Sequence, residues 1–209
     1  MAEPLANQRR LSKEEYLEME IRSDARNEFV DGEIFAMAGG SPNHSTICFN
    51  LIRRIGEALD ATDCRGFEGN MKLEIVAAEA FLYPDIMVVC GAVDSVENRR
   101  DAITNPVLIV EVLSPGTESF DRGRKFKLYQ MVPSLQEYVL VSQEEPTIET
   151  FFKQAPNRWL YTVTRGFAEA LRLHSLKFDV AMSDIYRKVD WMAAAGGNPS
   201  GPSEAGSGK

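Results

Sequence analysis

Two short and almost wholly apolar segments, each holding one carboxylate, limit what this chain can fold into more than any other feature. Residues 85–90 read Asp-Ile-Met-Val-Val-Cys, and residues 107–113 read Val-Leu-Ile-Val-Glu-Val-Leu. Continuous aliphatic runs are typical of central strands that are covered on both faces. A carboxylate in such a strand costs several kcal/mol unless it is paired, protonated or bound to a metal ion. Asp85 and Glu111 therefore predict a polar site built into a buried sheet.

The two acids point to a shared cation. If their strands are neighbours, Asp85 and Glu111 converge at one edge of the sheet, and a divalent ion offsets their repulsion. Pro84 favours a strand that starts at Asp85. With only His44 and His174 as histidines, we expect oxygen ligands, which select Mg²⁺ or Mn²⁺.

We do not expect the three cysteines to form a disulfide framework. Cys48, Cys64 and Cys90 are odd in number and contain no Cys-x-x-Cys pair. This pattern argues against disulfides and against structural zinc. We expect all three to be small buried hydrophobic residues.

Local signals place the remaining elements. Ser12 and Glu15 form a capping box for a helix ending near Glu20. Asp31-Gly32 predicts a hairpin with Glu28 on its first strand. Ser41-Pro42 starts a longer amphipathic helix. Further strands are expected at 67–76, 137–142, 147–153 and 158–164, and helices at 121–131 and 183–191.

One helix face carries a second group of candidates. Asp121, Lys125 and Tyr129 are spaced i, i+4, i+8, so Lys125 can reach toward the two acids as a cation. The surrounding Arg122, Arg124 and Lys127 predict a local basic patch that attracts polyanions. Each of these three residues also has a purely structural alternative. Asp121 would be the N-cap of the helix, Lys125 a solvated surface residue and Tyr129 a half-buried packing residue.

Overall composition narrows the class of protein. The chain has 209 residues and a formal net charge of −8, which excludes a passive polycation that holds nucleic acid by bulk charge. No long apolar run or export signal is evident, so we expect no membrane partner and a cytoplasmic location. We expect one domain over residues 10–192, a flexible segment 1–9 and a disordered Gly/Pro/Ser-rich tail 193–209.

Five segments together resemble a known family. They are Glu-Phe-Val-Asp-Gly-Glu-Ile (28–34), Ser-Pro-Asn-His (41–44), Tyr-Pro-Asp-Ile-Met-Val-Val-Cys (83–90), Val-Glu-Val-Leu-Ser-Pro-Gly-Thr (110–117) and Asp-Arg-Gly-Arg-Lys-Phe-Lys-Leu-Tyr (121–129). In this order they resemble the Uma2 family, which is grouped with the PD-(D/E)xK nucleases. The resemblance spans about residues 10–190. It implies an α/β fold with a restriction-endonuclease-like core, a mixed β-sheet flanked by helices with an added antiparallel hairpin, and a homodimer.

The resemblance also implies roles for single residues. Asp85 and Glu111 become the catalytic metal ligands, with the carbonyl of Val112 as a further ligand. The usual motif has lysine at position 113, where this chain has Leu113. Lys125 then takes over as the catalytic lysine, provided that its helix points at the acids.

Two further residues each have two alternative roles. Glu28 is implied as a supplementary acid, and its alternative is a solvated hairpin residue. His44 is either a residue that starts its helix or a group that contacts phosphate or a water near the site.

The function implied is that of a Mg²⁺- or Mn²⁺-dependent endonuclease that hydrolyses phosphodiester bonds, with DNA as the substrate. Two alternatives stay open. A non-catalytic dimer with the same fold that binds nucleic acid or protein is favoured by Leu113 and by the net charge of −8. A hydrolase of a smaller phosphate ester suits an acidic chain with a small basic patch.

Overall fold

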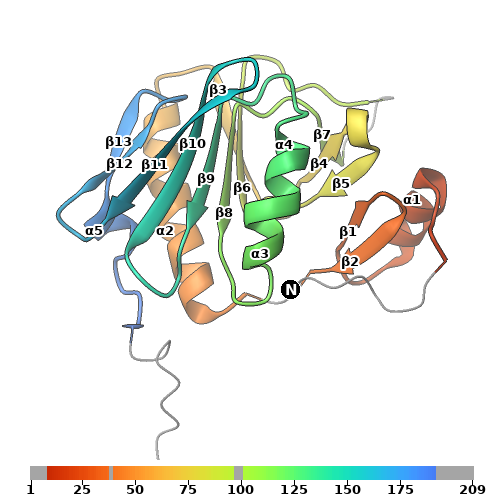
Figure 1. Ribbon diagram of the computed structural model, residues 1–209, viewed down its shortest axis with the longest axis horizontal. Helices are drawn as coiled ribbons and strands as arrows, with labels where there is room; N and C mark the ends of the chain where they lie inside the picture. Colours follow the sequence, from red (N-terminus) through yellow and green to blue (C-terminus); the bar gives the residue numbers. More distant parts are fainter. Residues whose placement is uncertain (1–8, 38–39, 97–100, 192–209) are drawn as a thin grey trace, which may run out of the picture.

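The strand that carries Glu111, β8, and the strand that begins directly after Asp85, β6, lie side by side within a six-stranded sheet (Figure 1). The computed structural model describes residues 9–37, 40–96 and 101–191. The sheet has the order β11-β10-β9-β8-β6-β3. Strands β8 and β9 are parallel and the other neighbours are antiparallel, so the sheet is mixed. Its strands are β3 (Cys64–Glu68), β6 (Ile86–Cys90), β8 (Leu108–Val112), β9 (Glu137–Val141), β10 (Thr147–Ala155) and β11 (Arg158–Arg165).

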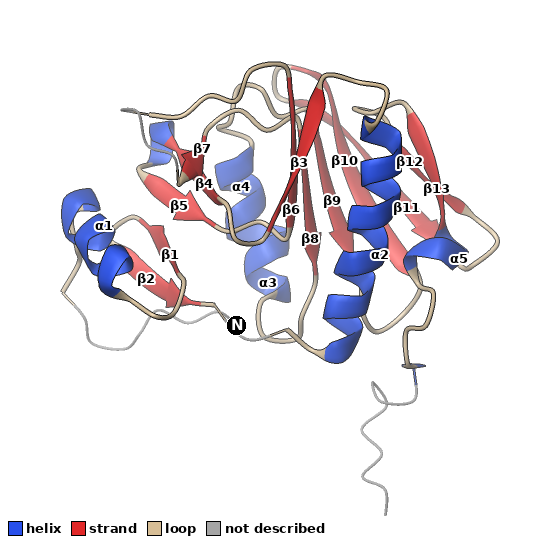
Figure 2. Ribbon diagram, turned by 180° about the vertical axis from the view of Figure 1, so that it is seen from behind, coloured by secondary structure: helices blue, strands red, loops and turns tan. Residues whose placement is uncertain are grey.

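Alternate residues of the central strands face two different layers. Val110 and Val139 pack with Leu51 of α2 (Pro42–Leu59), which covers one face (Figure 2). Ile109 and Leu140 face the opposite core, because side-chain direction alternates along a strand. The first face is also covered by the hairpin of β12 (Ala170–Leu173) and β13 (Phe178–Ala181) and by α5 (Met182–Ile185).

The second face is covered by one helical segment and a smaller sheet. The segment joins α3 (Glu118–Phe120), the π-helical turn η2 (Asp121–Lys125) and α4 (Phe126–Tyr129). The smaller sheet has the order β2-β1-β5-β4-β7. It contains β1 (Asn27–Val30), β2 (Glu33–Ala36), β4 (Lys72–Ile75), β5 (Ala80–Leu82) and β7 (Ala102–Ile103), with the 3₁₀ turn η1 (Val76–Ala78) between β4 and β5.

Local signals at the N-terminal part are confirmed. The capping box of Ser12 and Glu15 begins α1 (Lys13–Arg22), and Tyr16 stacks on Phe29 with ring centroids 4.8 Å apart. The β1–β2 hairpin turns at Asp31-Gly32, where φ is 53° and 79°. A turn with two positive φ values matches the twist of the flanking strands, which explains why this dipeptide marks the hairpin.

The single strand expected over residues 67–76 is wrong. The segment divides into the end of β3 and all of β4, which belong to different sheets. Residues 69–71 form the turn between them, with the amide of Met71 donating to the carbonyl of Glu68 at 3.0 Å. Apolar alternation alone does not detect such a turn, because both strands continue the same period.

The prediction that the cysteines form no disulfide is also wrong for two of the three. Cys64 on β3 and Cys90 on β6 are directly paired in the sheet register and form a disulfide bond, whereas Cys48 is a free thiol. An odd cysteine count says nothing about which two side chains a sheet places opposite each other. The disulfide ties the edge strand β3 to a central strand.

The predicted tail at 193–209 and most of the predicted flexible segment 1–9 lie outside the described residues. None of the helices in the described ranges combines the length and the apolar composition that crossing a bilayer requires. The short helix expected at 183–191 is found as α5, and it ends earlier, at Ile185.

Candidate active site

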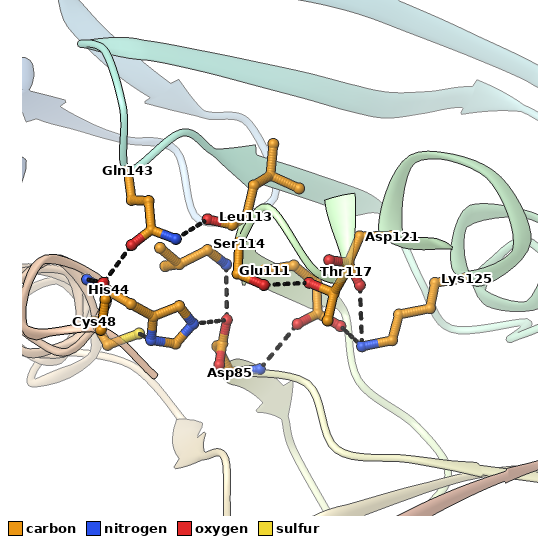
Figure 3. A network of polar contacts seen from close by, with 12 residues as sticks. His44, Cys48, Asp85, Glu111, Leu113, Ser114, Thr117, Asp121, Lys125 and Gln143 are labelled. Carbon is orange, nitrogen blue, oxygen red and sulfur yellow. Dashed lines mark hydrogen bonds and ion pairs between the residues drawn. The ribbon is translucent and has the colours of Figure 1, made fainter. Parts of the chain in front are cut away.

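Strand register brings the buried Glu111 and the partly buried Asp85 together. Strands β6 and β8 are antiparallel with Ile86 opposite Val110, so one step outward Asp85 meets Glu111. The Asp85 amide donates a 3.3 Å hydrogen bond to Oε2 of Glu111, and the Val112 amide donates a 2.7 Å bond to Oδ2 of Asp85. Figure 3 shows the contact between Asp85 and Glu111. The predicted convergence of Asp85 and Glu111 at one sheet edge is therefore present.

Lys125 points into this pair of acids from the helical segment. Its Nζ lies 3.0 Å from Oε1 of Glu111, 3.0 Å from Oε1 of Glu28 and 3.2 Å from Oδ1 of Asp121. The residue is only 6% exposed, so the alternative of a solvated lysine does not hold. Lys125 is a buried cation among three carboxylates.

The helical segment is held in place by contacts to the sheet. Tyr138 on β9 donates its hydroxyl to the carbonyl of Asp121 at 3.1 Å, inside the π turn. Tyr129 donates its hydroxyl to Oε1 of Glu111 at 2.6 Å. Tyr129 is fully buried rather than half-buried, and its hydroxyl is satisfied at the site as expected. Isolated π turns occur often at functional sites, where they change the direction of one side chain.

The N-cap expected at Asp121 is wrong. The helical segment begins at Glu118, with Thr117 at the cap position, and Asp121 is its fourth residue. Its side chain is turned inward, and the residue is 2% exposed. Among the described residues no group donates a well-aligned hydrogen bond to Oδ1 of Asp121, although this atom is ion-paired with Lys125.

Glu28 is a buried member of the site. It lies on β1, is 6% exposed and accepts a 3.1 Å hydrogen bond from the amide of Tyr83 through Oε1. The alternative of a solvated hairpin acid does not hold. The hairpin therefore contributes an acid from a sheet that does not contain Asp85 or Glu111.

His44 both starts its helix and faces Asp85. Its amide donates to Oγ of Ser41 at 3.0 Å, which caps α2. Its ring places Nε2 3.2 Å from Oδ2 of Asp85 and Nδ1 3.6 Å from Sγ of Cys48. Cys48 was not predicted as a site residue, although its i+4 spacing from His44 on an amphipathic helix was a usable signal.

Burial and charge shift the acid and base properties of these groups. Burial, opposed by Lys125, raises the pKa of Glu111 to about 8. Burial lowers the pKa of Lys125, but the nearby Glu111 and Glu28 outweigh it and hold this pKa well above its usual value. Burial also lowers the pKa of His44, and the hydrogen bond and charge of Asp85 reverse this, so that the net shift is upward.

The charges surround a small cavity that suits a cation. It has a volume of about 80 Å³ and is lined by four carboxylates, those of Glu28, Asp85, Glu111 and Asp121, against one lysine. Because a water molecule takes up about 30 Å³ in the liquid, this volume holds an ion with a few waters. Four carboxylates against one ammonium offer more oxygen ligands than Lys125 can satisfy, which fits a hard divalent ion.

The basic patch expected beside Lys125 is largely neutralised. Arg122 is ion-paired with Glu118 and Glu149, and Arg124 with Glu33 at 3.1 Å. Lys125 itself is buried. The prediction of a local polyanion-attracting patch is therefore wrong for Arg122 and Arg124, because acids from β2, β10 and the helical segment itself pair with them, and for Lys125, because it is buried.

Leu113 occupies the place where the motif of the resembling family has lysine. It is 5% exposed and packs in the core on the helical-segment side of the sheet. The lysine ammonium that this position lacks is present at the same acids through Lys125, 3.0 Å from Glu111. Lys125 thus supplies, from another element, the positive charge that the chain lacks at position 113.

The mixed sheet with flanking helices is the restriction-endonuclease-like architecture, and the solved structures agree. The crystal structure of "a putative nuclease belonging to DUF820" from Anabaena variabilis ATCC 29413 superposes with a TM-score of 0.69. It covers 84% of this chain and 97% of that one, at 16% identity. This similarity shows a shared fold.

Sequence comparison identifies the family. Residues 13–183 match the family model of Uma2, described as "Putative restriction endonuclease". The chain is 40% identical over 178 residues to the uncharacterized protein slr1290 of Synechocystis sp., covering 85% of this chain and 92% of the relative. It is 37% identical over 156 residues to sll1609 of the same organism, covering 75% and 88%. The chain belongs to the Uma2 family.

Proposed function

We propose that this protein is a metal-dependent endonuclease that hydrolyses phosphodiester bonds in DNA. The observation that carries the proposal is the meeting of Asp85 and Glu111 on adjacent strands with the ammonium of Lys125, 3.0 Å from Glu111. Two acids can hold a divalent ion that activates water, and a lysine beside them can stabilise charge that develops on a phosphate, which together serve phosphodiester hydrolysis. Membership of a family described by nuclease activity supports the same reading.

Each residue has a defined task in this proposal. Asp85 and Glu111 hold Mg²⁺ or Mn²⁺, with the carbonyl of Val112 as a further ligand. The ion, when bound, supplies an activated water and polarises a phosphoryl oxygen. Lys125 orients the water or neutralises charge that develops on the phosphate.

The remaining site residues are positioning residues. Tyr129 holds one oxygen of Glu111 by its 2.6 Å hydrogen bond. Glu28 and Asp121 hold the ammonium of Lys125 within 3.2 Å. His44 holds Asp85 from the α2 side through a 3.2 Å contact.

We propose DNA as the polymer and a homodimer as the active form in the cytoplasm. Cutting both strands of a duplex suits two active sites related by two-fold symmetry. Light scattering of the full chain tests this state, and a monomer at working concentration restricts the proposal to nicking of single strands.

The test is Mg²⁺- or Mn²⁺-dependent cleavage of supercoiled plasmid, single-stranded DNA and RNA. Asp85→Asn and Glu111→Gln should each lower the rate at least about 10²-fold, because each removes a ligand charge. Asp179→Asn, an exposed acid paired with Arg172, is the matched control and should leave the rate unchanged. Equal cleavage by Asp85→Asn and the parent protein identifies a contaminant and removes the proposal.

One observation favours a smaller phosphate ester as a second candidate. The arginines nearest the site are already ion-paired, which leaves few charges for a long duplex. Affinity of Asp85→Asn for duplex DNA, measured between 50 and 200 mM salt, discriminates between the two. A steep fall with salt requires several phosphate contacts and supports DNA. A flat response together with hydrolysis of a small diester supports the second candidate.

A further inference from the structure

A second group of metal-ligating side chains lies beside the oxygen-lined cavity. His44 and Cys48 are one helical turn apart on α2, and Asp85 faces them from the start of β6. One ligand atom from each of the three lies within 4.8 Å of the others. Figure 3 shows the thiol, the imidazole and the carboxylate in sequence. The proposed hydrolysis uses neither the thiol nor Nδ1 of the imidazole.

The imidazole is oriented for metal binding. Its Nε2 lies 3.2 Å from Oδ2 of Asp85, so in the neutral ring the proton is on Nε2, and the lone pair of Nδ1 faces Cys48. A histidine that binds a metal through one nitrogen commonly donates the other N–H to a carboxylate, which fixes the ring and makes it more basic. Asp85 is placed to do this.

The distance between the two donor atoms matches a tetrahedral ion. Sγ of Cys48 and Nδ1 of His44 are 3.6 Å apart. Sulfur and nitrogen bound to Zn²⁺ at ordinary bond lengths with a tetrahedral angle lie about 3.5 Å apart. An ion that binds both atoms at these bond lengths therefore leaves their separation almost unchanged.

There is open space beside these donors. Gly40 lies against the ring, and a Cβ at this position would be 3.0 Å from Nδ1 of His44, which is too close for ordinary contact. A cavity of about 630 Å³ is lined by Gly40, His44, Cys48 and Asp85 and provides the path by which an ion and its waters reach the donors.

We infer that Cys48 and His44 form a binding site for a borderline transition-metal ion, of the class of Zn²⁺ or Co²⁺, with Asp85 supporting the imidazole. The thiol proton is released to solvent when the metal–sulfur bond forms, so the ion replaces a proton and no oxidant is needed. Water fills the remaining coordination positions. The site differs from the oxygen-lined cavity in its donors, and it does not depend on the proposed hydrolysis.

The experiment is titration of the full-length chain with Co²⁺ alone, followed by absorption, with the Cys64–Cys90 disulfide intact and oxygen excluded so that Cys48 stays a free thiol. We expect the near-ultraviolet thiolate-to-cobalt charge-transfer band to saturate at one ion per chain. Cys48→Ser should lose the band. His44→Ala should weaken Co²⁺ binding at least about 10-fold, and Asp85→Asn by about 10- to 100-fold, as for a lost carboxylate behind a ligating histidine.

Matched controls separate this site from its neighbours. Glu111→Gln removes an acid of the oxygen-lined cavity and should keep the band. The double variant Cys64→Ser/Cys90→Ser removes the disulfide and should also keep it. Absence of the band in the parent protein with a titratable thiol at Cys48, or its persistence in Cys48→Ser, overturns the inference. Because the readout is spectroscopic, loss of nuclease activity has no bearing on the result.

Discussion

At the residue scale, the buried lysine dominates the energetics of the site. Lys125 compensates Glu28, Glu111 and Asp121, none of which is more than 6% exposed. A buried ion pair contributes little compared with apolar residues, but removing one partner leaves the others uncompensated at a cost of about 3–5 kcal/mol. The ammonium thus stabilises the folded state as well as serving the proposed chemistry.

Replacing this lysine should therefore destabilise the protein. We expect Lys125→Met to lower the free energy of unfolding in urea by about 3–5 kcal/mol. Lys127→Met, an exposed position on the same helix, should change it by less than about 0.5 kcal/mol. Added Mg²⁺ should recover part of the loss because it restores positive charge at the acids. Equal unfolding midpoints for the two variants would show that the carboxylates are neutral without the lysine.

The raised pKa of Glu111 predicts a pH dependence of stability. Burial raises this pKa to about 8 from an ordinary value of 4.5, so between these values the folded protein holds a proton that the unfolded chain has released. Stability that is present below pH 4.5 is then lost as the pH rises through about 8. In chelator, the thermal midpoint of the parent protein should fall over this range relative to that of Glu111→Gln. Thermal midpoints that change with pH in the same way in both proteins would contradict the raised pKa of Glu111.

At the scale of elements, the π turn decides where Lys125 points. A π turn contains one more residue per turn than an α-helix, so it changes the rotation of the side chains that follow. The turn runs from Asp121 to Lys125 and is anchored to β9 by Tyr138. It sets the rotation between Asp121 and Lys125, so that the two side chains pair with each other while Lys125 also reaches Glu111.

Deleting Gly123 should separate these side chains. The deletion restores a regular α-helix, and misplacement of a catalytic group by about 1 Å can cost 10²-fold in rate. We expect at least this loss in plasmid nicking. Gly123→Ala is the control, since its Cβ would meet nothing within 4 Å, and it should stabilise the helix by about 0.5–1 kcal/mol with activity kept. Full activity of the deletion variant would mean that the turn is dispensable.

At the scale of the whole molecule, the disulfide restricts the unfolded chain. It joins residues 26 apart in sequence and encloses the segment that contains β4, β5 and Asp85. A loop of this length corresponds to about 3.5 kcal/mol of chain entropy at 25 °C. The folded sheet already pairs β3 with β6, so closing the loop costs the folded state little backbone freedom.

Reduction should therefore lower stability. We expect the urea midpoint of the parent protein to fall on addition of a reductant, by an amount that corresponds to about 3.5 kcal/mol or less. Cys64→Ser/Cys90→Ser should start at the lower midpoint and not respond, whereas Cys48→Ser should respond like the parent. A midpoint that is insensitive to reductant in the parent protein would mean that the two thiols are not joined in solution.

Prediction from sequence succeeded where the determining forces are local or strongly patterned. The capping box at Ser12, the turn at Asp31-Gly32 and the buried strands around Asp85 and Glu111 each depend on a few neighbouring residues. It failed at the turn after Glu68, at the start of the helical segment and at the cysteine pair, where a partner from another segment decides the outcome.

By itself the sequence determined that Glu111 lies in one buried strand and Asp85 at the start of another, and the energetic cost of an unpaired charge there implied that the two acids share a site. Only the tertiary structure decided which groups meet them. The β6–β8 register sets Asp85 against Glu111, the π turn brings in Lys125, and the packing of α2 brings His44 to Asp85 with Cys48 beside it. These contacts join segments far apart in the chain, and no local preference encodes the distance between them.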